Sequence, residues 1–196
     1  MKNTRDLTLN ALFIALILVL SLVPNIGIIQ IGPLAIQAIH IPVIIAGLTL
    51  GFKSGILMGF VFGASTLIVA LTRASSPFDL LFINPILSVL PRILFGVSIG
   101  AMSGLMSNVV KADGVRFGVV AFVSSILHSV FVFIALYFII FLGSTPIIPG
   151  QENPGVLFQI LLGIFTFNSL IEAAAAAVIV PPIVIVLKKL MGHRYK

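Results

Sequence analysis

Long apolar stretches, separated by short segments rich in polar residues, glycine and proline, dominate this sequence. A helix needs about 20 mostly apolar residues to cross the hydrocarbon core of a membrane, and a backbone inside that core must satisfy its own hydrogen bonds. Hydrophobic residues make up 60% of the chain and charged residues only 8%, whereas a soluble domain carries about 25% charge. The sequence therefore predicts an all-α integral membrane protein.

We expect one membrane domain over residues 1–196 with six transmembrane helices. The apolar stretches place these spans at residues 7–24, 35–50, 54–71, 84–109, 116–142 and 156–187. The second span is short, and the loops after the first, third and fifth spans are the long ones. Because recognition residues concentrate on loops, we expect recognition on the side where those long loops lie.

The basic residues set the predicted orientation, since Lys and Arg accumulate on the cytoplasmic side of membrane proteins. With the N-terminus inside, only Arg73 falls in an outer loop, and Arg92 falls within a span. The other nine of the eleven basic residues are then cytoplasmic: Lys2, Arg5, Lys53, Lys111, Arg116, Lys188, Lys189, Arg194 and Lys196. Both termini are therefore predicted to be cytoplasmic, and the net charge of +6 needs no nucleic-acid partner.

Glycines recur at every fourth position in two predicted spans. Gly55, Gly59 and Gly63 lie in the third span, and Gly96, Gly100 and Gly104 lie in the fourth. Small residues at this spacing let helix backbones approach closely where lipid supplies no hydrophobic drive. We expect these two runs to pack helices within the chain.

Three polar residues lie where lipid is expected. Asn168 and Glu172 are four apart and share a helix face, and a carboxylate at such depth is costly unless it is paired. Arg92 follows Asn84 by eight residues, about 12 Å along a helix. Arg92 and Glu172 form either a structural ion pair or part of a ligand site in which the guanidinium binds a carboxylate. Both interpretations stay open, and they are compatible.

Other polar residues in or near the spans complete the candidate substrate contacts. Asn84 opens the fourth span, Gln37 and His40 share a face of the second, and His128 lies midway along the fifth. A lone buried histidine is more often structural than a ligand contact, so His128 has an alternative role as a structural hydrogen-bonding residue. The three His residues lack metal-ligand spacing, so we predict no metal site and no cofactor.

Motifs of the main enzyme classes are missing from the sequence. There is no cysteine, no His-Glu-x-x-His, no rhomboid-type Gly-x-Ser-Gly and no Gly-x-x-x-x-Gly-Lys-Ser/Thr. We therefore expect a small-molecule binding subunit of a transporter whose energy comes from another protein. A structural membrane subunit without a ligand is the alternative, in which Arg92 and Glu172 only pair.

Two stretches carry a family resemblance. "LTLNALFIALILVLSLVP", with Ala11 and Ala15, and then "IHIPVIIAGLTLGFKSGILMGFVFG" resemble the substrate-binding S components of energy-coupling factor (ECF) vitamin transporters. The resemblance implies capture of a vitamin from outside a prokaryotic plasma membrane. It also implies docking, through Ala11 and Ala15, on a transmembrane T protein that carries two ATPases.

Within this family, "HIPVIIAGL" and "FNSLIEAAAAAVIVPPI" resemble pantothenate-type S components most closely. Pantothenate carries one carboxylate, an amide and two hydroxyls, which Arg92, Asn168, Glu172, His128 and Asn84 would bind. Biotin also has a carboxylate and stays an alternative. Riboflavin and folate favour aromatic stacking, and the chain has no Trp and two Tyr, although its sixteen Phe residues keep riboflavin open.

Overall fold

The computed structural model describes residues 4–24, 26–31, 34–74, 79–141 and 154–192, and within them the chain is helical apart from one short hairpin. In chain order the elements are α1 (Thr4–Leu22), β1 (Ile28–Ile31), β2 (Leu34–Gln37), α2 (His40–Leu50), α3 (Phe52–Arg73), the 3₁₀ helix η1 (Asp79–Ile83), α4 (Pro85–Ser88), α5 (Leu90–Val109), α6 (Asp113–Phe141) and α7 (Pro154–Leu190).

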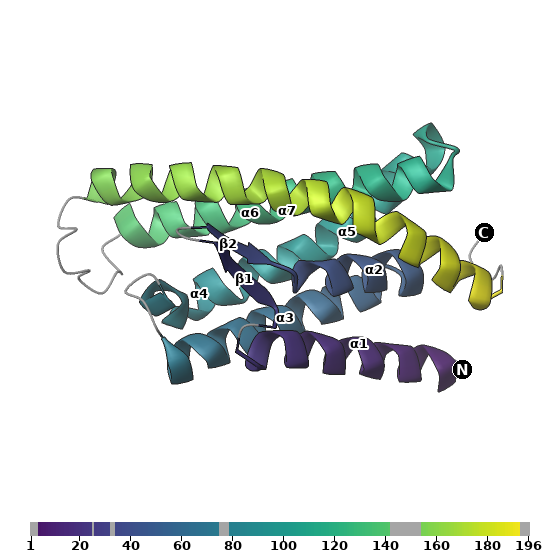
Figure 1. The fold of residues 1–196 in the computed structure, drawn as a ribbon, viewed down its shortest axis with the longest axis horizontal. Coiled ribbons are helices and arrows are strands. Elements are labelled where there is room, and N and C mark those ends of the chain that lie inside the picture. Colours follow the sequence, from purple (N-terminus) through teal and green to yellow (C-terminus); the bar gives the residue numbers. More distant parts are fainter. Residues whose placement is uncertain (1–3, 25, 32–33, 75–78, 142–153, 193–196) are drawn as a thin grey trace.

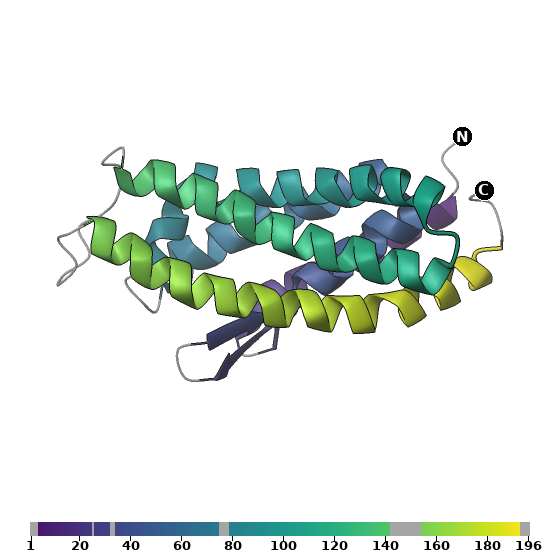
Figure 2. The same cartoon turned by 90° about the horizontal axis from the view of Figure 1, so that it is seen from above.

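The long helices run side by side in one elongated bundle (Figure 1), with α3 packed on α5 and α6 packed on α7. Among the described residues, five helical segments are long and apolar enough to cross a membrane, and α2 is a shorter apolar helix. The prediction of an all-α membrane protein is confirmed. The start of α1 and the end of α7 lie at the same end of the bundle (Figures 1 and 2). The side of the membrane that this end faces stays a prediction.

The second predicted span begins later than expected. Residues 35–37, which we expected to be helical, belong to strand β2, which pairs antiparallel with β1 from Ile28↔Gln37 to Ile31↔Leu34. Both strands are short and mostly apolar, β1 has three isoleucines, and Gly-Pro lies between them in the sequence, a combination that favours a hairpin. The remaining helix α2 has 11 residues, about 16 Å of helix, and spans about half of a hydrocarbon core.

The hairpin therefore takes up chain that a full-length second helix would have used. Figure 1 shows that α2 begins near the middle of the bundle. Figure 2 shows the hairpin projecting from one side, next to the middle of α7, which β2 contacts. This arrangement places the N-terminus of α2 and the end of β2 about midway along the length of the bundle.

The fourth predicted span, residues 84–109, is broken near its start into α4 and α5, and η1 precedes it. Asn84 caps α4, because its side-chain oxygen accepts a hydrogen bond from the backbone N–H of Ile86 at 2.9 Å. Pro91 follows at the start of α5 and has no N–H to donate to the carbonyl of Leu87, which a regular helix would require. A break in the helix next to Pro91 is the result.

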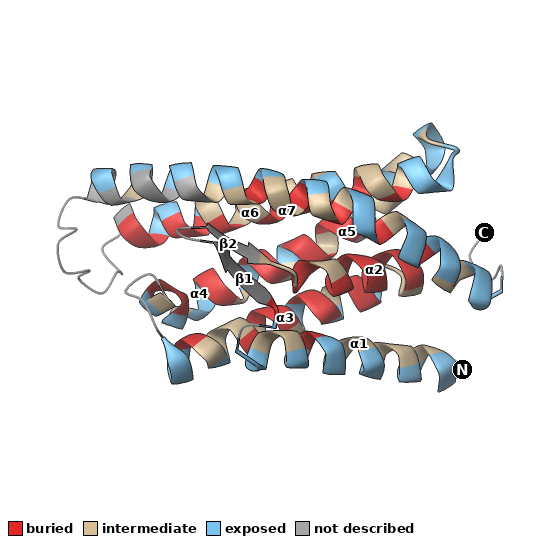
Figure 3. Cartoon of the chain, in the orientation of Figure 1, coloured by how far each residue is buried: buried red, intermediate tan, exposed pale blue. Residues whose placement is uncertain are grey.

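Helices α3 and α5 contact each other through backbone. A Cβ atom added to Gly59 would lie 2.3 Å from the carbonyl oxygen of Arg92, and one added to Gly96 would lie 2.3 Å from that of Gly55. A Cβ atom added to Gly63 would lie 2.8 Å from the Cα atom of Val89, whereas Gly104 has open space. The predicted packing within the chain is confirmed for these glycines other than Gly104. Figure 3 shows the buried residues gathered in this part of the bundle.

Candidate functional site

Arg92 lies in the first turn of α5 with only 2% of its surface exposed. Its Nη1 atom donates a hydrogen bond of 2.6 Å to the carbonyl oxygen of Leu87. This is the carbonyl that Pro91 leaves without a helical partner, so the arginine side chain satisfies the acceptor that the preceding residue has released. The proline and the arginine together fix the direction of the guanidinium group.

Two aromatic rings lie beside the Arg92 guanidinium. Its central carbon is 5.6 Å from the ring centre of Phe62 and 5.1 Å from that of Phe82. Cations are attracted to aromatic faces at these distances, and the attraction grows when water is absent. The Nε atom of Arg92 is buried and has no hydrogen-bond partner within the described part of the chain. A fixed cation with a donor left over is suited to hold a negatively charged ligand.

Glu172 makes a different contact from the ion pair considered above. Its Oε1 atom accepts a hydrogen bond of 2.7 Å from the backbone N–H of Gln37, at the end of β2. Arg116 and Asp113 form an ion pair at 2.6 Å, whereas no contact of this kind joins Arg92 to Glu172. Arg92 and Glu172 influence each other electrostatically without such a contact. The carboxylate therefore fastens the hairpin to α7, and the guanidinium is not occupied by it.

His40 is the first residue of α2 and is 2% exposed. Its Nδ1 atom is 2.5 Å from the carbonyl oxygen of Gln37, and its Nε2 atom is buried without a partner among the described residues. Gln37 thus joins Glu172 and His40 through its backbone N–H and C=O. The main chain of Gln37 thus has a structural role that the sequence did not reveal, and a substrate contact by Gln37 stays a prediction.

His128 lies in α6 and packs between two aromatic rings. Its ring centre is 4.8 Å from that of Phe95 and 5.7 Å from that of Phe62, the same ring that faces Arg92. The Nε2 atom of His128 and the Oγ atom of Ser124 are both buried, with no partner in the described ranges. Ser124 was not among the predicted contacts, although its spacing of four residues from His128 puts both on one helix face.

The remaining two predicted residues differ in position. The Oδ1 atom of Asn168, one turn before Glu172 in α7, is buried and lacks a partner within the residues described. Asn84 lies at the start of the fourth span, where its side-chain oxygen caps α4. The structure thus links Arg92 to His128 through the shared ring of Phe62, and Glu172 to His40 through the backbone of Gln37. A ligand contact by Asn84 stays a prediction.

Residues 5–184 match the model of a family described as "ECF transporter, substrate-specific component". This chain belongs to that family. It is also 32% identical over 179 residues to the "Pantothenate transporter PanT" of Leuconostoc mesenteroides subsp. mesenteroides, with 87% of this chain and 86% of the relative covered. The resemblance noted in the sequence is confirmed. The chain is the substrate-specific component, or S component, of an ECF transporter, and it serves transport, not catalysis.

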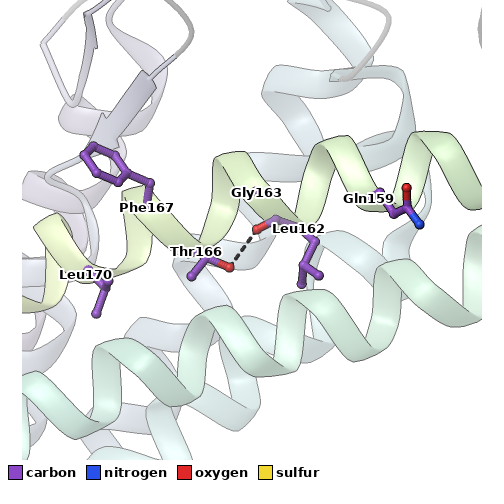
Figure 4. Close-up of a pocket in the computed structure, with 6 residues that line it drawn as sticks. All are labelled: Gln159, Leu162, Gly163, Thr166, Phe167 and Leu170. Carbon is purple, nitrogen blue, oxygen red and sulfur yellow. Dashed lines mark hydrogen bonds between the residues drawn. The ribbon is translucent and has the colours of Figure 1, made fainter.

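A hollow on the surface of this S component lies away from the buried polar cluster. Its lining comes from one face of α7, which Figure 4 shows: Gln159, Leu162, Gly163, Thr166, Phe167 and Leu170. The hydroxyl of Thr166 is already bonded to the carbonyl oxygen of Leu162 at 2.7 Å. Phe167 and Leu170 are exposed, as expected for a face that meets lipid. No polar groups converge there from other described elements, so we do not place the substrate in this hollow.

Ala11 and Ala15 lie on the exposed side of α1. This helix is peripheral in the S component: it packs on α3 and α2, and Ile17 is its one fully buried residue in the described range. Large apolar residues around the alanines are exposed, with Leu12 at 60% and Leu16 at 44%. The face is apolar and available to lipid or to another membrane protein.

Proposed function

We propose that this S component captures pantothenate from outside the cell and delivers it to an ECF module for transport. The buried Arg92 guanidinium, with its unpartnered Nε atom, is the observation that carries the proposal. A carboxylate ligand would neutralise that cation in a place where an unpaired charge is costly. The identity to a pantothenate transporter supports the same substrate.

The other groups of the cluster fit the rest of the molecule. Pantothenate carries two hydroxyls and an amide beside its carboxylate. His40, His128, Ser124 and Asn168 each offer a buried polar atom that has no partner among the described residues. Because buried polar groups are nearly always hydrogen-bonded in native proteins, several buried atoms without a partner favour a polar ligand. Phe62 and Phe95 would cover its two methyl groups.

Delivery requires partners that lie outside this chain. We infer that the exposed face of α1 around Ala11 and Ala15 docks on a transmembrane T protein that carries two ATPase subunits. Small residues allow close helix contact in a membrane, which supports this face as the docking surface. The proposed location is the plasma membrane of a prokaryote, with both termini cytoplasmic, as the distribution of basic residues favours.

Thermal unfolding of the purified protein in detergent tests the substrate. Pantothenate, biotin, riboflavin, folate and thiamine are added separately, each at increasing concentration. A ligand at about one hundred times its dissociation constant stabilises the folded state by ~2.7 kcal/mol, which raises the unfolding midpoint visibly. We expect a shift with pantothenate alone. A shift with biotin or riboflavin instead would replace the substrate and keep the family role, whereas no shift with any vitamin would contradict the proposal.

A further inference from the structure

The backbone of Gln37 orients a histidine in the buried cluster. Its N–H donates to Glu172 of α7 at 2.7 Å, and its C=O lies 2.5 Å from Nδ1 of His40. Gln37 ends strand β2 and His40 begins α2, so these two contacts hold the junction between hairpin and helix against α7. The position of the His40 ring is therefore set by groups on three elements.

The Gln37 contact also decides which ring nitrogen of His40 carries the proton. A carbonyl oxygen can only accept a hydrogen bond, so Nδ1 of His40 must be the donor. The ring is buried and makes no ion pair within the described ranges, so it is neutral, because an unpaired buried charge is costly. A neutral imidazole with its proton on Nδ1 has only a lone pair on Nε2. The Nε2 atom of His40 can therefore accept a hydrogen bond but cannot donate one.

The same bundle core holds a cation and a second acceptor. Arg92 and His128 both lie beside the ring of Phe62, and Asn168 lies one turn before Glu172 on α7. The Oδ1 atom of Asn168 is another buried acceptor, and neither it nor His40 Nε2 has a partner among the described residues. A ligand that satisfied these groups would present a negative charge to Arg92 and hydroxyl or N–H donors to the acceptors.

We propose that the Nε2 atom of His40 accepts a hydrogen bond from a hydroxyl or amide N–H of the substrate, and that Gln37 and Glu172 position it for that role. This inference rests on the proposed function and adds a selectivity rule to it. Analogues in which the donor facing His40 is replaced by hydrogen or by oxygen should be rejected, because a buried acceptor is then left unsatisfied. His40 is thereby a specificity-determining residue, and Glu172 is a positioning residue.

The test combines three ligand analogues with one substitution. Pantothenate has three donors besides its carboxylate, so the probes are the two analogues that each lack one hydroxyl and the ester that replaces the amide N–H. Dissociation constants are measured by calorimetry for the unmodified protein and for His40→Phe. Phenylalanine keeps a planar ring and removes both nitrogens, so any loss of packing affects all four ligands alike.

We expect His40→Phe to weaken pantothenate binding about tenfold or more, the usual effect of one buried hydrogen bond. One analogue should bind the unmodified protein about tenfold more weakly than pantothenate, and it should lose less than about threefold on His40→Phe. An equal loss for pantothenate and all three analogues would overturn the role of His40. Failure of the unmodified protein to bind pantothenate would overturn the proposed function and this inference with it.

A second measurement needs neither a ligand nor a variant that folds. Nitrogen-15 NMR of the histidine-labelled, unmodified protein in lipid reports which ring nitrogen is protonated. We expect the His40 signals of a neutral ring protonated on Nδ1. A ring protonated on Nε2, or a doubly protonated ring, would overturn the inference even if pantothenate binds.

Discussion

At the scale of single residues, Arg92 combines a structural contact with a free donor. One nitrogen of its guanidinium satisfies the Leu87 carbonyl that Pro91 leaves unpaired, and Nε has no partner in the described part of the chain. Removing the side chain would therefore affect both the helix break and the ligand. The two effects are separable, because only the second depends on ligand concentration.

We predict that Arg92→Ala weakens pantothenate binding by ~2 kcal/mol or more, because the ligand carboxylate loses a buried charged partner. Calorimetric titration measures the loss. Arg116→Gln is the matched control, since it removes an arginine whose partner is Asp113 at the other end of the bundle. Normal binding by Arg92→Ala would remove Arg92 from the site.

A second prediction at this scale concerns Glu172. The side chain of Gln can still accept the hydrogen bond from the Gln37 N–H, whereas that of Leu cannot. We expect Glu172→Gln to keep slow amide exchange at Gln37 in the ligand-free protein and affinity within about threefold of the unmodified value. Glu172→Leu should speed that exchange and weaken binding more than about tenfold. Hydrogen exchange followed by mass spectrometry checks the first effect, and unchanged exchange in Glu172→Leu would contradict the contact.

At the scale of elements, backbone contact between α3 and α5 holds Arg92 in place. Gly59 lies against the carbonyl of Arg92 itself, and Gly96, one turn further along α5, lies against Gly55. A methyl group at either position would have to push two helix backbones apart, since no flexible side chain stands between them.

We predict that Gly96→Ala lowers the stability of the protein by about 1–3 kcal/mol, the usual cost of overpacking. It should also weaken ligand binding, because α5 carries Arg92. Gly104→Ala is the control on the same helix: no atom lies within 4 Å of its added Cβ, so we expect an unchanged unfolding midpoint. Thermal unfolding in detergent compares the two, and equal midpoints would argue against a tight α3–α5 contact.

At the scale of the whole molecule, α1 is the least buried of the five long apolar helical segments described. Only 6% of its 18-residue apolar stretch is buried inside the protein, compared with 39% of the corresponding stretch of α3 and 44% of that in the segment that contains α5. A helix with so little internal packing can present its outer face to a partner without disturbing the site.

We predict that Ala11→Trp or Ala15→Trp leaves pantothenate binding intact and abolishes co-purification with the ATPase module, because the bulky ring blocks close helix approach. Val178→Trp on α7 is the control, since Val178 is 75% exposed on a different helix. Affinity purification from cells that express all the subunits measures the effect. Survival of the complex in both alanine variants would place the docking face elsewhere.

Much of this protein could be predicted from its sequence because membrane helices are local structures. The length of each apolar stretch and its low content of charged residues require helices across a bilayer, whatever their neighbours. The spacing of Gly55, Gly59 and Gly96 likewise predicted close helix contact, and the contact is present. The hairpin formed by β1 and β2 was not predicted, because a short apolar run next to a helix is equally compatible with an extension of that helix.

The contacts of the site depended on tertiary structure. Arg92 and Glu172 were candidates from the sequence because both are charged and lie in apolar spans, but nothing local says which atoms they meet. Glu172 meets the backbone of Gln37, 135 residues away, and Arg92 meets the carbonyl that Pro91 releases. The sequence alone determined that buried charges exist and that a bilayer makes them costly. The tertiary structure decided their partners, because partners are fixed by how helices pack and where backbone groups are left unpaired.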